Sequence, residues 1–166
     1  AVTVAFFTQG DPYRGHLEGL FLGGLLILSV GAFDDRFTLG PKTKLAVQVV
    51  AAAIAVGYGF EIRHITDPVT RTAWIMPSWL MTLVTMLWIV GITNALNLID
   101  GLDGLCTGVA AIIGITLTII CWQGNEVLGV VVGTTFVGAL LGFLPHNFLP
   151  ARIFLGDTGA LFIGYV

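Results

Sequence analysis

Charged residues are scarce in this 166-residue sequence. Only 10% of the residues are Asp, Glu, Lys or Arg, whereas 56% are hydrophobic, and the mean hydropathy is +0.94. A soluble domain of ordinary composition has about a quarter of its residues charged, so this chain has too few polar side chains to cover a surface in water. The composition excludes an ordinary soluble globular domain and predicts a protein embedded in a lipid bilayer.

Basic residues and cysteines are also few. Seven Lys and Arg residues against ten Asp and Glu residues give a net charge of −3. This balance excludes the basic surface that nucleic-acid binding requires. The two cysteines, Cys106 and Cys121, lie in the same apolar segment. We interpret them as packing residues of the membrane core rather than as metal ligands or a redox pair.

Long stretches of the chain contain no charged residue at all. A helix needs roughly 20 residues to cross the hydrocarbon core of a bilayer. The sequence therefore predicts an all-α fold, a polytopic transmembrane helical bundle with about five full spans plus partial terminal ones. The charge-free stretches are 19–33, 45–60, 72–99, 105–125 and 127–151, and a sixth begins at residue 158. The predicted helices run near 16–33, 43–59, 76–96, 105–122 and 127–144, with part of another from 158.

The two ends of the chain indicate the middle of a longer protein. The sequence starts without Met, and "AVTVAFF" at 1–7 is typical of the end of an earlier apolar segment. The last apolar segment stops at Val166. We therefore expect residues 1–166 to form a single membrane-embedded domain, the central fragment of a longer protein. The stretch 60–75 is polar, and we expect it to form a loop outside the membrane.

Most of the acidic residues that could do chemistry fall in alternate gaps between the predicted spans. If each span crosses the membrane once, successive gaps lie on opposite sides, and these acids all emerge on one face. Basic residues on this face outnumber those on the other by four to three, which favours the cytoplasmic side. The acidic residues of this face are Asp34, Asp35, Asp100, Asp103 and Asp157.

Two polar motifs lie at the boundaries of the predicted spans. The motif "AFDDRFTLGPKTK" contains Asp34 and Asp35, whose adjacent carboxylates repel each other unless a cation or a proton offsets their charge. In "NALNLIDGLDGL", Asn94, Asn97 and Asp100 recur every three residues and share one face of a helix. Amide and carboxylate oxygens are ligands that Mg²⁺ accepts. The alternatives are a solvated helix end for the first motif and a capped helix end for the second.

A third motif, "ARIFLGDTGAL", leads into the last apolar segment. Asp157 or Thr158 could cap the following helix, and the neighbouring glycines would let a ligand approach backbone N–H groups. The three motifs together on one face favour a metal or phosphate site over capping. Lys42, Lys44 and Arg152 add positive charge beside the acids, which indicates a metal-bridged phosphate substrate rather than a free cation. For the two lysines, positive charge flanking a membrane span is the alternative.

Taken in order, the motifs "FDDRFTLGPKTKLAVQ", "NALNLIDGLDGL" and "RIFLGDTGALFIGY" resemble those of the polyprenyl-phosphate N-acetylhexosamine-1-phosphate transferases. This membrane family includes the phospho-MurNAc-pentapeptide translocase of peptidoglycan synthesis. The stretch "WIVGITNALNLIDGLDGL" is most similar to the bacterial undecaprenyl-phosphate GlcNAc-1-phosphate transferase branch, whose members begin teichoic acid, O-antigen or related envelope polymers.

The resemblance implies a role for each matching position. Asp34 and Asp35 match paired aspartates that are regarded as catalytic. Asp157 matches the Mg²⁺-binding aspartate, and Asn97 matches an asparagine that can share the ion. The predicted substrate-binding residues are the acidic pair of the nucleotide pocket, Asp100 and Asp103, the uracil-stacking aromatic Phe154, the diphosphate contact Arg152, and the polar residues Asn94, Lys44 and Asn147 near the site.

The implied reaction transfers N-acetylglucosamine-1-phosphate, or a related sugar-1-phosphate, from a UDP-sugar to undecaprenyl phosphate and releases UMP. It would be the first membrane step of cell-envelope polysaccharide synthesis, with Mg²⁺ as the cofactor and Mn²⁺ as a second candidate ion. We expect a multi-pass protein of the plasma (inner) membrane with its active site on the cytoplasmic face, no nucleic-acid partner, and a homodimer as one candidate assembly. The alternative function is an ion-coupled membrane transporter, which would place its carboxylates near the bilayer midplane.

Overall fold

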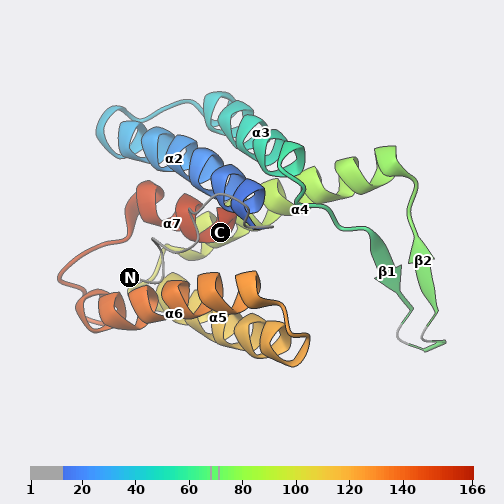
Figure 1. The fold of residues 1–166 in the computed structure, drawn as a ribbon. Helices are drawn as coiled ribbons and strands as arrows, with labels where there is room; N and C mark the ends of the chain where they lie inside the picture. The colour runs from blue at the N-terminus through green and yellow to red at the C-terminus, as the bar shows by residue number, and fades with distance from the viewer. Residues whose placement is uncertain (1–12, 68, 71) are drawn as a thin grey trace.

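The computed structural model describes residues 13–67, 69–70 and 72–166 of the chain. Within these residues six helices follow one another, with a short β-hairpin between the second and the third (Figure 1). The predicted all-α class is confirmed, whereas the apolar segment predicted at 1–7 lies outside the described residues. The elements are α2 (Arg14–Phe37), α3 (Pro41–Gly57), β1 (His64–Thr66), β2 (Ala73–Ile75), α4 (Ser78–Ile99), α5 (Leu105–Gln123), α6 (Val127–Asn147) and α7 (Gly156–Tyr165).

Four of these helices are long and apolar enough to cross a membrane. The helices α2, α4, α5 and α6 have 24, 22, 19 and 21 residues, with hydropathy values from 1.7 to 2.3. Helix α3 has 17 residues, which is about the shortest length that spans the hydrocarbon core. By length and composition, the described bundle therefore has four clear spans and a fifth helix at the limit, close to the five spans predicted.

Helices α2, α4 and α6 each extend three or four residues beyond their predicted ends, α4 to Ile99. Helix α2 ends at Phe37 instead of near residue 33, so Asp34 and Asp35 lie inside the helix rather than in the following gap. A charged side chain does not stop a helix, and α2 ends only where Thr38 takes a left-handed conformation with φ 51°. Helix α6 continues through Pro145 to Asn147, although the proline has no N–H group to donate to the carbonyl one turn earlier.

The polar stretch 60–75 is a β-hairpin in its central part, not an irregular loop. Strands β1 and β2 pair antiparallel, with Ile65 opposite Trp74, and both strands are exposed. Ile, Thr and Trp favour strand conformation. The carboxylate of Asp67 stabilises the turn by accepting hydrogen bonds from the Val69 and Thr70 N–H groups at 2.8 and 3.3 Å. The sequence signal for a hairpin was therefore present, although the predicted structure for this stretch was a loop.

Among the described helices, α7 is the shortest and lies at the centre of the bundle. It lies between α2 and α4 (Figure 1). Its residues Ala160 and Ile163 belong to one buried apolar cluster, and Leu161 and Tyr165 belong to a second. Opposite faces of the same helix thus contribute to two cores, which fixes the position of its N-terminal end relative to the other helices.

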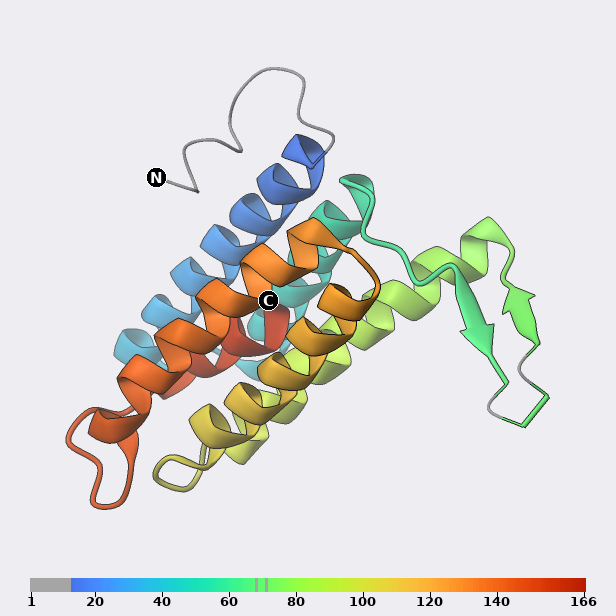
Figure 2. The same cartoon turned by 60° about the horizontal axis from the view of Figure 1, so that its bottom comes forward.

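The polar connections meet at one end of the bundle. Figure 2 shows the α2–α3 turn, the α4–α5 loop and the α6–α7 loop at the same end, whereas the hairpin and the α5–α6 turn lie at the opposite end. This arrangement confirms the prediction that the three acidic motifs emerge on the same side of the bundle.

Close contact of α7 with its neighbours depends on glycines and gives a first testable prediction. A Cβ atom on Gly164 would lie 2.5 Å from the Thr93 Cα atom of α4, so the two backbones would have to separate. We expect Gly164→Ala to lower the free energy of unfolding by about 1–3 kcal/mol, measured by thermal unfolding of the purified full-length protein. The matched control is Gly142→Ala on α6, where the added Cβ meets nothing within 4 Å. Equal melting temperatures for the two variants would contradict the prediction.

Candidate active site

Lys44 joins the first and third acidic motifs. Its ammonium Nζ donates a hydrogen bond to the Asp34 carboxylate at 2.8 Å and another to the Asp157 carboxylate at 3.1 Å. Asp34 is 7% exposed, so its charge is largely removed from water and depends on Lys44 for compensation. Carboxylates from α2 and α7 thus bind the same ammonium group of α3, although Asp34 and Asp157 are far apart in the sequence.

The local geometry of the α2–α3 turn directs Asp34 and Lys44 toward each other. The Thr38 N–H group donates to the Asp34 carbonyl oxygen at 2.9 Å, and the Leu39 N–H group donates to the Asp34 carboxylate. Pro41 then begins α3, because its missing N–H costs nothing at the first helical position. Lys44 lies within the first turns of α3, next to the end of α2 that carries Asp34.

Asp35 has different partners from Asp34. Its carboxylate accepts hydrogen bonds from the Asp157 N–H group at 2.8 Å and from the Thr158 N–H group at 3.1 Å, and also from the Thr158 hydroxyl. The paired aspartates of the first motif therefore both reach α7, one through the Lys44 ammonium and the other directly through the backbone. The alternative that Asp157 or Thr158 caps α7 with its own side chain is wrong, because no side chain of the α7 N-cap region does so.

The two asparagines of the second motif differ in their environment. Asn94 forms an amide pair with Gln48 of α3, which is 2% exposed, and also donates to the Val90 carbonyl oxygen at 2.7 Å. Asn97 is half-buried one turn further along α4 and has no hydrogen-bond partner among the described residues. The Asn97 amide is therefore available to a ligand, whereas the substrate contact predicted for Asn94 would compete with an interhelical bond.

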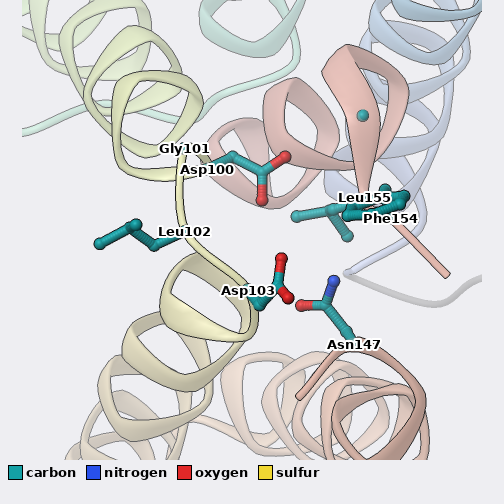
Figure 3. Close-up of a pocket in the computed structure, with 8 residues that line it drawn as sticks. Asp100, Gly101, Leu102, Asp103, Asn147, Phe154 and Leu155 are labelled. Atoms are coloured by element: carbon teal, nitrogen blue, oxygen red, sulfur yellow. The ribbon is translucent and has the colours of Figure 1, made fainter. Parts of the chain in front are cut away.

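A cavity of about 240 Å³ lies beside this cluster. Figure 3 shows the carboxylates of Asp100 and Asp103 directed into the space that faces Phe154 and Leu155. Phe154 is 73% exposed and presents its ring at the edge of the cavity. The lining residues are Asp100, Gly101, Leu102, Asp103, Asn147, Phe154, Leu155 and Gly156.

Two of the predicted substrate-binding residues, Asp103 and Asn147, form hydrogen bonds within the lining of this cavity. The Asp103 carboxylate accepts a hydrogen bond from the Ala151 N–H group at 2.9 Å. The buried Asn147 side chain accepts from the Thr107 hydroxyl at 2.8 Å and donates to the Ile153 carbonyl oxygen at 3.0 Å. These bonds tie the α6–α7 loop to the α4–α5 loop and to α6, and they tie α6 to α5. Their effect is to fix the segment that carries Phe154, whether or not the same side chains also touch a ligand.

Arg152 is not part of the carboxylate cluster. Its side chain is exposed and forms no ion pair among the described residues, while its N–H group donates to the His146 carbonyl oxygen at 2.9 Å. The predicted diphosphate contact of Arg152 stays a prediction.

Asp100 has an altered acidity. Burial, and then the negative charges of Asp157 and Asp35, raise the pKa of its carboxyl group from 3.8 to about 6. The raised pKa of Asp100 thus reflects repulsion from a carboxylate of each of the other two motifs. The second motif therefore joins the same negatively charged region at the end of the bundle.

This raised pKa predicts a pH dependence of stability. The folded state binds the Asp100 proton more tightly than the unfolded state, so the free energy of unfolding falls as the pH rises from about 4 through about 6. The two-unit shift would correspond to about 3 kcal/mol, which solvent screening reduces to about 1 kcal/mol at this half-exposed position. We expect Asp100→Asn to be more stable than the wild type at pH 7 and equal to it near pH 4, measured as melting temperature against pH. A difference that does not change with pH would contradict this.

Comparison with known proteins identifies the family. The family described as glycosyl transferase family 4 matches residues 17–166. The chain belongs to glycosyl transferase family 4. It is 38% identical to the probable undecaprenyl-phosphate N-acetylglucosaminyl 1-phosphate transferase of Bacillus subtilis (strain 168), over 99% of this chain and 46% of that protein.

Two other relatives of this family 4 chain have different names. Over 95% of the chain and 41% of the relative, it is 35% identical to the decaprenyl-phosphate N-acetylglucosaminephosphotransferase of Mycolicibacterium smegmatis (strain ATCC 700084 / mc(2)155). Over 84% of the chain and 47% of the relative, it is 40% identical to the phospho-N-acetylmuramoyl-pentapeptide-transferase of Latilactobacillus sakei subsp. sakei (strain 23K). The chain spans less than half the length of each of these relatives.

The donor atoms of this family 4 site fit a Mg²⁺ ion that is held only in part by protein. Within the described ranges, no group of three or more His, Cys, Asp or Glu residues is arranged as a metal cage. Mg²⁺ commonly takes one or two carboxylates and completes its shell with waters and substrate phosphates. Asp157 carries a carboxylate, which Lys44 also contacts at 3.1 Å, and Asn97 carries an amide with no side-chain hydrogen-bond partner among the described residues. Carboxylate and amide oxygens are donor types that such an ion accepts.

Two residues that support the site were not found from the sequence of this family 4 chain. Gln48 is the only amide side chain in the stretch 45–60, and this isolation in an apolar span was a signal that it has a polar partner. Thr107 gave no such signal, because threonine is common in membrane helices, where its hydroxyl usually bonds to its own helix. Thr107 instead donates to Asn147 of α6.

Proposed function

We propose that the full-length protein transfers a sugar-1-phosphate from a UDP-sugar to a polyprenyl phosphate and releases UMP. The observation that carries this proposal is the bridge from Asp34 through Lys44 to Asp157, next to a cavity lined by Asp100 and Asp103. The bridge lies at the end of a bundle of apolar helices. This is the boundary at which a lipid-borne phosphate and a water-soluble nucleotide can meet.

In the proposed reaction, an oxygen of the lipid phosphate attacks the phosphorus atom that carries the sugar. A new phosphoanhydride bond forms, the bond between the two phosphates of the UDP-sugar breaks, and its electron pair leaves with UMP. Both reactants are anions, so positive charge must offset their repulsion. A Mg²⁺ ion, or Mn²⁺ in its place, bound by Asp157 and Asn97 would supply this charge. Lys44 supplies one permanent positive charge at the same place.

The cavity is suited to the nucleotide. The hydrogen-bond acceptors Asp100 and Asp103 line the cavity, and so does the exposed Phe154 ring. An aromatic ring binds a nucleobase by stacking, and nearby carboxylates accept hydrogen bonds from base or ribose groups. UDP-N-acetylglucosamine is the proposed donor and undecaprenyl phosphate the proposed acceptor, because the names of two relatives refer to N-acetylglucosamine and to undecaprenyl or decaprenyl phosphate. We place this site on the cytoplasmic face of the membrane.

A transport function is disfavoured by the position of the carboxylates. Coupling-ion sites of transporters lie near the bilayer midplane on interrupted helices. Here the acidic side chains lie at the last turn of α2, at the end of α4 and at the start of α7. The described spanning helices are otherwise free of Asp within their central turns.

The test uses the purified full-length protein with UDP-N-acetylglucosamine, undecaprenyl phosphate and Mg²⁺, and measures UMP and lipid-linked sugar together. We expect both products in equal amounts, and neither when the lipid phosphate or the divalent ion is left out. UDP-N-acetylgalactosamine in a parallel reaction tests the choice of sugar. If no donor releases UMP with the lipid, while vesicles containing the protein show cation flux, the transferase function is wrong and the transporter alternative is right.

A further inference from the structure

Helix α7 does not cap its own N-terminus. Its N-cap residue is Leu155, which has no side-chain hydrogen bond to offer. The first N–H groups of a helix have no intrahelical acceptor and need a partner from elsewhere. This end of α7 also carries Asp157, so an uncapped and fraying first turn would leave the position of that carboxylate undefined.

The missing cap comes from Asp35 of α2. Its two carboxylate oxygens accept the Asp157 and Thr158 N–H groups at 2.8 and 3.1 Å and the Thr158 hydroxyl. A carboxylate at a helix N-terminus is stabilised both by these charge-assisted bonds and by the helix dipole. The contact spans 122 residues of sequence between Asp35 and Asp157, so it sets the position of α7 relative to α2.

Gly156 is a second and independent sign that this contact is built into the fold. Its φ angle is +64°, and a Cβ atom on it would lie 2.9 and 3.1 Å from the two Asp35 carboxylate oxygens. Only glycine takes this conformation at no steric cost and leaves that space open. The backbone at the first residue of α7 is therefore shaped to receive the Asp35 side chain.

Asp34 and Asp35 point in different directions because neighbouring residues on a helix are about 100° apart. Asp34 is buried and pairs with Lys44, which itself reaches Asp157. Asp35 binds the backbone of α7 instead. The second ionisation of a phosphate monoester has a pKa of about 6, so a lipid phosphate is mostly ionised at neutral pH and does not require a second carboxylate to activate it.

We propose that Asp35 is a positioning residue: its carboxylate caps α7 and holds Asp157 in place against Lys44 and Asp34, and it acts through Asp157 rather than on the substrate. This inference rests on the proposed transferase function and divides the paired aspartates into two roles. Asp34 faces the charge centre, whereas Asp35 holds the helix that delivers Asp157 to it.

The test compares Asp35→Asn with Asp35→Ala in the full-length protein. Asparagine keeps one of the two acceptor oxygens that face the Asp157 and Thr158 N–H groups, whereas alanine keeps neither. We expect Asp35→Asn to keep at least about tenfold more kcat than Asp35→Ala, and we expect its melting temperature to lie about 3 °C higher. At position 34, where the partner is the Lys44 ammonium, the corresponding Asn and Ala variants should lose activity to a similar extent. Equally inactive Asn and Ala variants at position 35 with wild-type melting temperatures would overturn the proposal.

A double-mutant cycle with Thr158→Val supplies the second measurement. Because the Thr158 hydroxyl donates to Asp35, Asp35→Ala should cost at least about fivefold less kcat/KM in the Thr158→Val background than in the wild type. Independent, multiplicative losses would show that Asp35 does not act through the Thr158 hydroxyl, and would count against the proposed cap. The same cycle read in melting temperature needs no activity. It therefore decides the capping contact even if the wild-type protein releases no UMP and the proposed function fails.

Discussion

Replacing Lys44 by methionine is expected to reduce sugar-phosphate transfer by about a hundredfold or more and to lower the stability of the protein at the same time. Lys44 is the only cation within hydrogen-bond distance of Asp34 and Asp157 among the described residues. Without it, a carboxylate that is 7% exposed remains charged beside a second carboxylate. Breaking a fully buried ion pair costs about 3–5 kcal/mol, and we expect about 2–3 kcal/mol here because Lys44 is partly solvated.

The control for this experiment is two residues away. Lys42 is exposed and has no ion pair in the described part of the chain. Lys42→Met removes the same charge from the same turn of α3, so it should change activity and melting temperature very little. If both variants behave alike, the effect comes from the net positive charge at the membrane edge, and the bridge between Asp34 and Asp157 has no special role. Activity is measured as UMP release, and stability as the melting temperature in the same detergent.

The helices and their common polar end could be predicted from the sequence because both depend on short-range properties. A charge-free stretch of sufficient length predicts a span wherever it occurs, and alternate crossing then places the acidic motifs together. The end of α2 was predicted four residues too early, since its signal is the backbone conformation of Thr38 rather than the charge of Asp34. The hairpin was missed because its strands have only three residues each.

The partners of the site residues could not be predicted in the same way. The sequence shows that Asp34 and Asp35 are adjacent, but it does not show which of them turns toward Lys44 and which toward α7. That choice depends on the rotation of α2 against α7, which Gly31 sets by allowing its backbone to lie against Thr158. The pairing of Asn94 with Gln48 likewise depends on the register of two helices. Contacts of this kind are properties of the packed bundle.

Replacing Asp157 by asparagine is expected to reduce transfer on the order of a thousandfold, by loss of the charge that holds a divalent ion against the substrate diphosphate. The substitution keeps the shape of the side chain and the N–H group that binds Asp35. It also leaves Asp34 as the sole carboxylate on Lys44, so one source of repulsion disappears. The melting temperature should therefore stay equal or rise while activity is lost.

A loss of activity without a loss of stability distinguishes a functional carboxylate from a structural one. The measurements are kcat as a function of Mg²⁺ concentration and the melting temperature with and without Mg²⁺. We expect Mg²⁺ to stabilise the wild type and to have a much smaller effect on Asp157→Asn. Asp67→Asn is the charge-matched control, because Asp67 lies in the hairpin turn at the other end of the bundle. Equal stabilisation of all three proteins by Mg²⁺ would remove Asp157 from the ion site, and an Asp157→Asn protein with near-normal kcat would remove it from the reaction.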